Sequence, residues 1–534
     1  MPSKQTRPGK PCRRRDIDMK RFNVAGVCIP EKHYMVDQAR CIEKLQNMIG
    51  EGQYLSLNRG RQYGKTTLLY LLERALKDKY RIIAISFEAA DDIFESAALF
   101  SKGLLRKFKE GLEIRGDAGP LCEVCEREIE GGLYWDGLQG RIRELCTVSD
   151  KPIVLIVDEV DKSSDNQIFI TFLGLLRDMY QMREKYSAPA FMSVILSGVH
   201  DIRHLRLRIR PDEAHKRNSP WNIAAPFDGE LSFSVANIEK MLEEYRSEHG
   251  VCMESSQIAE SIFDYTAGHP FLVSKICKML DEDGYGWSRE GISEAVKKLL
   301  SEEISLFESL KNRLVDYPDM SFRIQRLLFD GSGIPDNPDD EELSLAKMYG
   351  FINVRNNVIA IANRIFEMRL YNYFMTTAQA INSEMYRAAT DERNFFIKQG
   401  ALDMDLIIER FAFSFNDIYG SEEAPFIEEV GRRYFLLYLK PIINGRGNYY
   451  IEARTRNRLR TDVVVDYLGK QYVVELKIWR GSSYNERGEE QLFDYLEHYH
   501  TDRGWLVSFC FNKNKRVGIH EVKLGDKTIV EAIV

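Results

Sequence analysis

The sequence predicts an α/β protein in which a parallel sheet is covered by helices, followed by a helical region and a second, smaller α/β region. Short apolar runs at residues 54–57, 81–87, 152–157 and 190–196 alternate with longer segments whose apolar residues repeat at helical spacing. Alternation of this kind is typical of a parallel sheet with helices on its faces. The pattern becomes helical after residue 226, and the C-terminal region returns to strands after one helix.

Length and composition limit the class of protein. A chain of 534 residues corresponds to about three to five domains, since a domain usually holds roughly 100–200 residues. Hydrophobic residues make up 44% and charged residues 29%, which excludes a disordered chain, a collagen and a disulfide-rich mini-protein. The net charge of −7 excludes a uniformly basic nucleic-acid coat protein, but it is compatible with a basic face that binds nucleic acid.

The cysteines, the apolar runs and the N-terminus predict the compartment. Nine cysteines without the spacing of a disulfide framework indicate reduced thiols, so we expect a cytoplasmic protein. The sequence contains no run of 18 apolar residues, so we expect no membrane partner. The basic N-terminal segment lacks the apolar core of a signal peptide. We therefore interpret residues 1–21 as a tail, with Met19 as an alternative start.

Changes in periodicity predict six segments. Residues 351–363 (FINVRNNVIAIAN) contain two β-like runs separated by Asn356-Asn357, a pair that suits a tight turn, and helical segments precede them. Helices followed by a hairpin resemble a winged helix. The expected segments are a basic tail (1–21), an α/β core (22–226), a helical lid (227–310), a winged-helix-like segment (311–375), a helical connector (376–420) and a C-terminal α/β domain (421–534).

A phosphate-binding loop is predicted where the first apolar run ends. Residues 55–68 read LSLNRGRQYGKTTL: a β-like run, a polar loop closed by Gly64-Lys65-Thr66, and the start of an amphipathic helix. In this context loop amides and the helix N-terminus cradle phosphates, Lys65 reaches the β and γ oxygens, and Thr66 can ligate Mg²⁺. The usual pattern has a glycine five residues before Gly64, where this chain has Arg59. The alternative is a chance Gly-Lys-Thr at the start of a helix.

A buried strand with an acidic end supports the nucleotide interpretation. Residues 153–159 read IVLIVDE. In a nucleotide site, Asp158 would hold Mg²⁺ through water and Glu159 would polarise the attacking water. After the next apolar run, Ser197 could contact the γ-phosphate or that water as a sensor. The alternatives are a buried strand whose end is polar by chance, and a simple turn at the end of a strand.

Two features further along the chain could belong to the same site. One of four following arginines could act as an arginine finger, whereas a solvated basic face is the alternative; they are Arg206, Arg208, Arg210 and Arg217. The segment Gly268-His-Pro270 interrupts the helical region and could pack on the adenine. A helix N-terminus that uses proline at its first position is the alternative.

A second constellation of charged residues lies in the C-terminal region. Residues 460–477 read RTDVVVDYLGKQYVVELK, two β-like runs joined by a turn. Residues two apart on a strand share a face, so Glu475 and Lys477 point the same way, and a hairpin could bring Asp462 close to Glu475. Two carboxylates and a backbone carbonyl form a hard-oxygen Mg²⁺ site, and the lysine could orient or activate a water. The alternative is a surface ion pair at a strand edge.

Side chains from two predicted helices could complete this site. The helix after the hairpin places Gln491 and Tyr495 on one face, four residues apart. Upstream, Glu428 or Glu429 of another helix could supply a further carboxylate. Taken together, these residues predict a metal-dependent phosphodiesterase site.

The residues of both sites resemble known families. FNVAGVCIPEKHYMVD, NRGRQYGKTT and IVLIVDEVD resemble the bacterial predicted AAA-ATPases, which are P-loop NTPases of the additional-strand class, close to the STAND and archaeal ATPase groups. TDVVVDYLG, YVVELKIW and EEQLFDYL resemble the PD-(D/E)XK nuclease domain, of restriction-endonuclease-like fold, that such ATPases often carry. The resemblance extends from about residue 22 to residue 534 and is most specific in the N-terminal half.

The resemblance implies roles for the candidate residues. It implies that Lys65 and Thr66 form the phosphate-binding loop of a site for ATP and Mg²⁺, that Asp158 and Glu159 are its acidic pair, and that Gly268 and Pro270 belong to a lid that closes on the nucleotide. Gly64, Thr67 and Ser197 are further candidate residues of this site. It implies a nuclease site formed by Asp462, Glu475, Lys477, Gln491 and Tyr495. Glu428 fits the family's helix carboxylate better than Glu429, and with Asp462 and Glu475 it would hold the metal of that site. Arg59 departs from the general loop pattern, which puts the geometry of the loop in question.

These inferences together predict an ATP-binding and ATP-hydrolysing protein whose C-terminal domain is a Mg²⁺-dependent endonuclease. The expected partner is nucleic acid, with DNA favoured, and assembly into a homo-oligomer is also expected. Nucleotide binding or hydrolysis would govern access to the cleavage site. The alternative is an ATP-dependent signalling switch whose C-terminal domain binds nucleic acid or a partner without cleavage.

Overall fold

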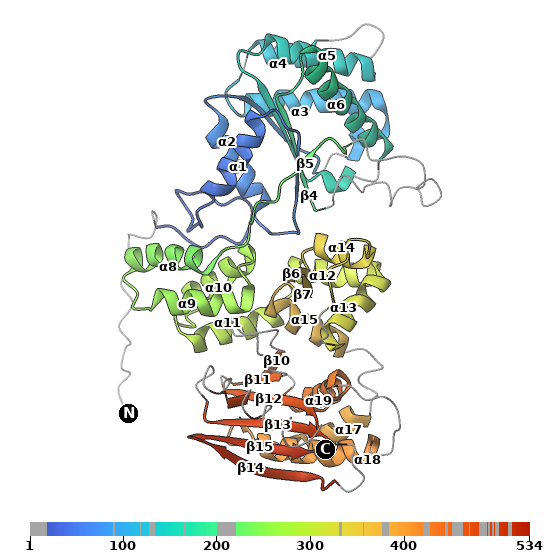
Figure 1. Cartoon of the computed structure of the whole chain (residues 1–534). Helices are drawn as coiled ribbons and strands as arrows, with labels where there is room; N and C mark the ends of the chain where they lie inside the picture. Colours follow the sequence, from blue (N-terminus) through green and yellow to red (C-terminus); the bar gives the residue numbers. More distant parts are fainter. Residues whose placement is uncertain are drawn as a thin grey trace, which may run out of the picture. The chain divides into compact units, whose positions relative to one another are not determined.

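The computed structural model, whose helices and strands are labelled in Figure 1, divides into two compact units. One unit comprises Met1–Phe263 with Gly268–Trp287, and the other comprises Asp264–Ala267 with Ser288–Val534. Among the described residues, no helix combines the length and the apolar character needed to cross a lipid bilayer. The structure describes residues 19–88, 91–117, 119–127, 134–163, 166–199, 221–330, 334–355, 357–375, 384–419, 428–443, 447–450, 463–468, 470–479, 489, 492–493, 496, 501–510 and 515–534.

A parallel sheet forms the centre of the first unit, as predicted. The order across the sheet is β2-β3-β4-β1-β5, and neighbouring strands are parallel. β4 therefore lies between β1 and β3. The strands are β1 (Leu55–Asn58), β2 (Arg81–Ser86), β3 (Ile153–Asp158), β4 (Ser193–Gly198) and β5 (Ala225–Pro226).

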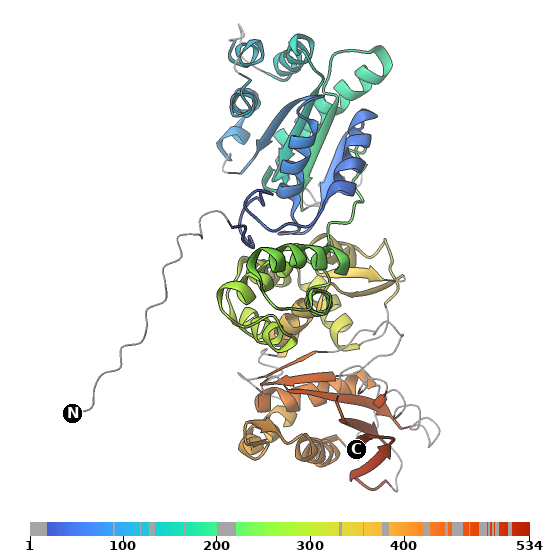
Figure 2. The same ribbon diagram turned by 90° about the vertical axis from the view of Figure 1, so that its left-hand side faces the viewer.

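Helices cover both faces of this sheet (Figure 2). Along β3, Val154 and Ile156 pack with α1 and α2, whereas Leu155 and Val157 pack with the helices of the other face. Because both faces are buried, the strand reads as a continuous apolar run and not as an alternating one. The helices are α1 (Ala39–Gly50) and α2 (Lys65–Leu76) on one face, and α3 (Ala97–Glu113), α4 (Pro120–Glu126), α5 (Trp135–Val148) and α6 (Gln167–Tyr186) on the other.

Further helices of the first unit follow the sheet in the sequence. They are α8 (Val235–His249), most of α9 (Ser255–Thr266) and α10 (Pro270–Glu282). The start of the described chain packs on α8, since the rings of Phe22 and Tyr34 lie 5.2 and 5.4 Å from that of Tyr245. The region predicted to be helical after residue 226 is thus helical, and the segment after the predicted tail belongs to the folded unit.

The second unit begins with helices and a hairpin. Asn357, at the turn of the hairpin, has a φ of 62°, which asparagine tolerates better than most residues. The predicted order of helices followed by an antiparallel hairpin is present. The elements are α11 (Arg289–Ser301), α12 (Ser305–Asp316), α13 (Pro318–Asp330), α14 (Glu341–Met348), β6 (Ile352–Arg355), β7 (Val358–Ile361) and α15 (Arg364–Met375).

The C-terminal part of the second unit contains a mixed sheet. The order is β10-β11-β12-β13-β15-β14, in which β12, β13 and β15 are parallel and the other neighbours are antiparallel. The short elements α17 (Glu384–Glu392), β8 (Ile397–Lys398) and β9 (Ala401–Leu402) precede it. The strands are β10 (Gly447–Tyr450), β11 (Val463–Tyr467), β12 (Lys470–Ile478), β13 (Arg503–Phe509), β14 (Gly518–Leu524) and β15 (Lys527–Ile533).

This sheet also has apolar contacts on both faces. α18 (Met404–Tyr419) and α19 (Glu428–Ile443) pack on one face, where the ring of Phe415 lies 5.2 Å from that of Phe509. At Gly431 of α19 an added Cβ would lie 2.4 Å from the Phe509 ring, so α19 approaches the sheet closely. The apolar cluster of the other face comprises Val473, Leu492, Leu496, Leu506 and Ile529.

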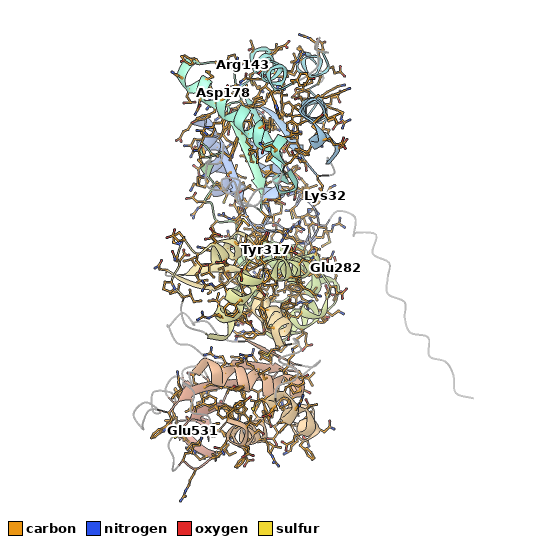
Figure 3. The ribbon with its side chains drawn as sticks, turned by 90° about the vertical axis from the view of Figure 1, so that its right-hand side faces the viewer. Lys32, Arg143, Asp178, Glu282, Tyr317 and Glu531 are labelled. Atoms are coloured by element: carbon orange, nitrogen blue, oxygen red, sulfur yellow. The ribbon has the colours of Figure 1, made fainter. Side chains whose placement is uncertain are left out.

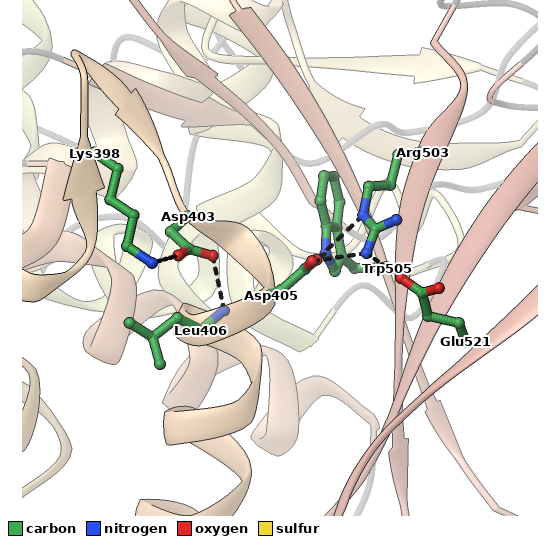
Figure 4. A network of polar contacts seen from close by, with 7 residues as sticks. All are labelled: Lys398, Asp403, Asp405, Leu406, Arg503, Trp505 and Glu521. Carbon is green, nitrogen blue, oxygen red and sulfur yellow. Dashed lines mark hydrogen bonds and ion pairs between the residues drawn. The ribbon is translucent and has the colours of Figure 1, made fainter.

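Ionic contacts fasten the start of α18 to the sheet (Figure 4). Asp405 accepts hydrogen bonds from the guanidinium of Arg503 at 2.7 Å and from the indole of Trp505 at 2.8 Å, and both donors lie on β13. Arg503 also donates to Glu521 of β14 at 2.5 Å. Asp403 caps α18 by accepting a backbone hydrogen bond at 3.2 Å. The position of α18 against the sheet is therefore fixed at its N-terminus by charge as well as by apolar packing.

Candidate functional site

The loop between β1 and α2 has the form of a phosphate-binding loop. Within this loop, which the structure describes completely, the residues with positive φ are Gln62 at 60° and Gly64 at 80°. Gly64 is the N-cap of α2, and it has no Cβ to oppose this left-handed conformation. α2 begins at Lys65, so the free amides of its first turn adjoin the loop, an arrangement that favours bound phosphate.

Arg59 occupies the position of the usual first glycine of the loop. Its φ is not positive, so the backbone does not require glycine at this position. Its guanidinium donates to the carbonyl oxygens of Asn58 and Gly229, each at 2.9 Å, and its amide donates to Gly198 at 3.2 Å. Arg59 therefore fastens the loop to the end of β4 and to the segment after β5.

Lys65 fills the loop with a buried positive charge. Its side chain is 7% exposed, and its ammonium donates to the carbonyl oxygens of Arg59 at 2.9 Å and Gly60 at 3.1 Å. Burial lowers the pKa of Lys65, and the carboxylates of Asp161 and Asp158 oppose that effect. The loop thus holds an ammonium group beside nearby carboxylates, which suits a site for an anion with a divalent cation.

The structure brings the start of α2 to the acidic end of β3. The hydroxyl of Thr66 donates to Asp158 Oδ2 at 3.0 Å, although about ninety residues separate them in the sequence. The other oxygen of Asp158 accepts the amide of Glu159 at 3.0 Å. A hydroxyl and a carboxylate are the oxygen ligands that Mg²⁺ prefers, so this donor set fits that ion.

Glu159 has a strained backbone and a perturbed carboxyl group. Its φ is 58°, a left-handed value that costs roughly 1–3 kcal/mol for a residue with a Cβ. Burial raises the pKa of Glu159, and the neighbouring Asp158 raises it further. Such a carboxyl accepts a proton more readily than an exposed one, which is the property of a general base.

Two residues meet at the end of β4: Ser197 of the strand, which the sequence indicated, and Asp161 of the segment after β3, which it did not. Ser197 is fully buried, and its hydroxyl has no hydrogen-bond partner among the described residues. Asp161 accepts the amide of Val199 at 2.6 Å, and a Cβ added at Gly198 would lie 2.9 Å from its carboxylate. Asp161 therefore sets the position of the strand end that carries Ser197. In the sequence, Asp161 could have been noticed only as the second aspartate of the stretch IVLIVDEVD.

The backbone around residue 268 requires a glycine at this position. Its φ is 75°, and an added Cβ would lie 2.0 Å from the carbonyl oxygen of Phe233. Its own carbonyl accepts the Phe233 amide at 2.8 Å. Pro270 is the first residue of α10, where its missing amide hydrogen costs nothing. The structure therefore supports the helix-start interpretation of this segment, and it leaves a nucleotide contact by Gly268 and Pro270 as a prediction.

His269 joins this segment to the phosphate-binding loop. The centroid of its ring lies 4.3 Å from that of Tyr63, which precedes Gly64. Burial lowers the pKa of His269 to about 3, so the ring is neutral at physiological pH. The sequence contained no signal for this pair, because the two rings come from segments about two hundred residues apart.

Thr67 faces the N-terminal segment. Its hydroxyl accepts a hydrogen bond from the amide of Cys28 at 3.1 Å. The hydroxyl is thus engaged with the polypeptide that precedes α1, while the neighbouring Thr66 turns to Asp158. Thr67 is also a candidate nucleotide-binding residue, and that role stays a prediction.

In the C-terminal sheet, the structure brings Glu475 and Lys477 together on β12. The ammonium of Lys477 lies 3.0 Å from Glu475 Oε1, as expected for side chains two residues apart on one strand. Glu475 is completely buried. The prediction of a hairpin with β11 also agrees with the structure, because Val463 pairs with Val474.

Several predicted residues lie outside the described part of the chain. Asp462, Gln491 and Tyr495 are among them, and for Glu428 the structure describes the backbone at the start of α19 but not the side chain. The four arginines of which one could act as an arginine finger also lie outside it; they are Arg206, Arg208, Arg210 and Arg217. Within the described residues there is no group of three or more His, Cys, Asp or Glu side chains that could hold a metal ion.

A row of polar groups that the sequence did not indicate crosses the C-terminal sheet. Glu531 of β15, labelled in Figure 3, is buried and accepts the hydroxyl of Ser508 at 2.6 Å. Its other oxygen lies 3.0 Å from His520 of β14. Ser508 is the partner of Lys477 in the parallel register of β12 and β13, so the row lies on the same face as Glu475.

Comparison with solved structures finds similar chains at low sequence identity. The Walker-type ATPase paby2304 of Pyrococcus abyssi is 16% identical with a TM-score of 0.45, and the match covers 65% of this chain and 99% of that chain. Cdc6p of Pyrobaculum aerophilum is 15% identical with a TM-score of 0.31, covering 63% and 95%. The RuvB Holliday junction branch migration motor of Thermotoga maritima is 11% identical with a TM-score of 0.31, covering 64% and 96%.

Comparison with curated proteins gives no significant match. Comparison with family profiles gives a match to a family described as an AAA-like domain, over residues 29–295. This range is half of the chain, and it includes the phosphate-binding loop, the acidic end of β3 and the start of α10. The chain therefore belongs to the AAA-like domain family.

Proposed function

We propose that the protein binds ATP with Mg²⁺ at the loop before α2 and hydrolyses it. The observation that carries this proposal is the hydrogen bond of 3.0 Å between Thr66 and Asp158, because P-loop ATPases hold Mg²⁺ between these two residue types. When bound, the ion would neutralise charge that develops on the phosphate oxygens. Lys65 adds a second positive charge from within the loop.

Glu159 is the residue that we assign to activation of water. Its raised pKa favours transfer of a proton from water to the carboxylate. Ser197 would contact the γ-phosphate or the attacking water, since its buried hydroxyl has no other hydrogen-bond partner among the described residues. Gly268 and Pro270 would line the nucleotide from the lid, next to the ring contact between His269 and Tyr63.

For the C-terminal domain, residues 421–534, the proposed function is Mg²⁺-dependent cleavage of nucleic acid. The support is the contact between the buried carboxylate of Glu475 and the partly exposed ammonium of Lys477, since a buried charge is costly compared with an apolar residue. Asp462 directly precedes Val463, whose partner Val474 is the neighbour of Glu475. Asp462 and Glu475 would hold the ion, which would polarise the phosphodiester, and Lys477 would orient the attacking water.

Other parts of the second unit have proposed roles in the same function. Residues 311–375 would form a winged helix that contacts DNA, on the basis of helices α12, α13 and α14 followed by the hairpin of β6 and β7. Glu428 and Gln491 would add a carboxylate and an amide to the cleavage site. Several copies of the chain would assemble into a homo-oligomer.

A second candidate function is an ATP-dependent switch without nuclease activity. The direct contact between Lys477 and Glu475 favours it, because an ammonium at 3.0 Å neutralises a buried carboxylate and can serve stability alone. In that case the C-terminal domain would bind nucleic acid or another partner, and the ATPase would control that binding.

One set of assays distinguishes the two functions. The protein is incubated with supercoiled plasmid DNA and Mg²⁺ or Mn²⁺, with and without ATP, while phosphate release is measured in parallel. The variants are Lys65→Ala, Lys477→Ala and Asp462→Ala, with Lys470→Ala as a control because that lysine is exposed at the start of the same strand.

A nuclease should cut the plasmid in the wild type and in Lys470→Ala, and should lose at least about 100-fold of its rate in Lys477→Ala and Asp462→Ala. Intact plasmid in every condition, with phosphate release that Lys65→Ala abolishes, would establish the switch. Equal phosphate release by Lys65→Ala and the wild type would refute the ATPase.

A further inference from the structure

A buried carboxylate of the C-terminal sheet is held by a helix and not by the sheet. Asp466 of β11 is 4% exposed. Its Oδ2 accepts the hydroxyl of Ser293 at 2.6 Å, and its Oδ1 lies 2.9 Å from the ammonium of Lys297. Both partners are on α11. The loss of such partners from a buried carboxylate strongly destabilises the folded protein. The position of β11 therefore depends on the position of α11.

Tyr265, at the end of α9, belongs to the same cluster. Burial raises the pKa of its hydroxyl to about 12, Asp466 contributes to that rise, and a hydrogen bond with Ser293 opposes it. The preceding residue, Asp264, pairs with Arg364 of α15 at 2.5 Å. The short segment of residues 264–267 is therefore anchored within the second unit. Tyr265, Ser293, Lys297 and Asp466 together are called the Asp466 cluster below.

The polypeptide passes from the second unit to the first directly after this segment, between Ala267 and Gly268. These two residues have φ values of 46° and 75°, so the passage is made by consecutive left-handed residues. The next residue, His269, lies against Tyr63 of the phosphate-binding loop. Three residues thus lie between Tyr265 and His269, a tether of at most about 14 Å when extended.

We propose that the Asp466 cluster couples the nucleotide state of the first unit to the C-terminal sheet. A nucleotide that shifts Tyr63 and His269 would pull on the tether, move Tyr265 and change the hold of α11 on Asp466. β11 would respond, and with it the pairing between β11 and β12, the strand that carries Glu475 and Lys477. The proposal rests on the proposed nucleotide binding and specifies how it would regulate the C-terminal site.

The proposed coupling requires that the Asp466 cluster makes different contacts with and without bound nucleotide. A ligand shifts the equilibrium between two conformations only by the difference in its affinity for them. Ser293 and Lys297 bind Asp466 in one state and release it, wholly or in part, in the other. Linkage makes the effect reciprocal, so weakening the cluster must also change the affinity for nucleotide.

Hydrogen–deuterium exchange of the full chain tests the proposal without a nuclease assay. Exchange is measured with and without a slowly hydrolysed ATP analogue and Mg²⁺, in residues 59–76 and in residues 463–478. The variant is Asp466→Asn, which keeps the shape of the side chain and removes its charge. The control is Asp405→Asn, since Asp405 is a paired carboxylate of the same unit outside the Asp466 cluster.

In the wild type and in Asp405→Asn, the analogue should change exchange in both regions. In Asp466→Asn the response of residues 463–478 should be at least about fivefold smaller, while residues 59–76 respond as before. The same variant should change the dissociation constant of the analogue, whereas Asp405→Asn should not. Tyr265→Phe keeps the ring and removes one hydrogen bond, so it replaces Asp466→Asn if that variant does not fold.

The outcomes separate the two proposals. Unchanged exchange of residues 59–76 in the wild type would mean that no nucleotide binds at the loop, and the proposed function would fail first. A response in residues 59–76 without any response in residues 463–478 would overturn the coupling alone. An undiminished response in both Asp466→Asn and Tyr265→Phe would also overturn it, because the signal would then bypass the cluster.

Discussion

Replacing Gly268 by alanine should destabilise the first unit far more than the same change at an open glycine. The added Cβ would lie 2.0 Å from the carbonyl oxygen of Phe233, which is backbone and cannot swing aside like a side chain. The left-handed φ of 75° adds a cost of about 1 kcal/mol for alanine. Relief of the clash would also break the hydrogen bond from the Phe233 amide to Gly268.

The magnitude follows from these separate effects. Overpacking against a fixed atom costs about 1–3 kcal/mol, and loss of the hydrogen bond costs about 1 kcal/mol. With the backbone strain, the total for Gly268→Ala is about 3–5 kcal/mol. Gly250, after α8, has a φ of 65° and no atom within 4 Å of an added Cβ, so Gly250→Ala should cost only about 1 kcal/mol.

The assay is urea-induced unfolding of the full chain, followed by the fluorescence of a nucleotide analogue bound at the loop and by circular dichroism. Gly268→Ala should shift the unfolding transition of the first unit to lower urea and weaken binding of the analogue, since His269 and Tyr63 follow the displaced backbone. Gly250→Ala should shift the transition slightly and leave binding unchanged. Equal shifts for the two variants would refute the clash with Phe233 as the cause.

Three further predictions concern the same contacts. Thr66→Ala should weaken Mg²⁺-dependent binding of ATP about tenfold and leave Mg²⁺-independent binding unchanged, as titrations with and without EDTA would show. Burial lowers the pKa of His269 to about 3 in the folded protein. Below pH 6.5 the imidazole is therefore protonated in the unfolded chain but not in the folded one, and the free energy of unfolding falls as pH decreases. About 2 kcal/mol should be lost between pH 7 and pH 5, and His269→Leu should lose that much less over the same interval. Asp405→Asn should destabilise the C-terminal sheet by about 1 kcal/mol at low salt and by less in 1 M NaCl, because Arg503 and Asp405 are both partly exposed; an effect independent of salt would contradict the ionic origin.

Local pattern was sufficient to predict the elements that lie in both sheets. The run at residues 153–157 is apolar at every position because β3 is buried on two faces, and that property is visible in the sequence. The period of two residues likewise placed Glu475 and Lys477 on one face of a strand, where the structure has them 3.0 Å apart. Gly64 marked the start of α2 through the conformation that only glycine adopts easily.

Residues whose partners come from distant segments could not be predicted in this way. Asp161 acts on Val199 because β4 is the neighbour of β3, and the order of strands in a parallel sheet is not a local property. Glu531 and Ser508 meet for the same reason, since β13 and β15 are neighbours and β14 pairs on the far side of β15. The sequence shows the chemical type of these side chains, whereas the contacts between them follow from the order of the strands.

The predicted helical lid shows where apolar periodicity reaches its limit. α10 buries Leu272 and Ile276, α11 buries Ile292 and Val296, and the two patterns are alike, yet α10 belongs to the first unit and α11 to the second. Burial of apolar surface is not directional, so an amphipathic pattern states that a face is covered and not by what.

Polar groups on α11 determine which part of the chain this helix packs against. Ser293 and Lys297 find their carboxylate on β11, and the carbonyl of Leu300 accepts the guanidinium of Arg369 on α15 at 2.7 Å. Each of these contacts has one geometry and is costly to break when buried, so it selects a single partner for the helix. On this argument the division of the chain between Trp287 and Ser288 is determined by hydrogen bonds and charges on α11. Replacing Ser293 and Lys297 together should loosen α11 from the second unit while leaving both helices folded.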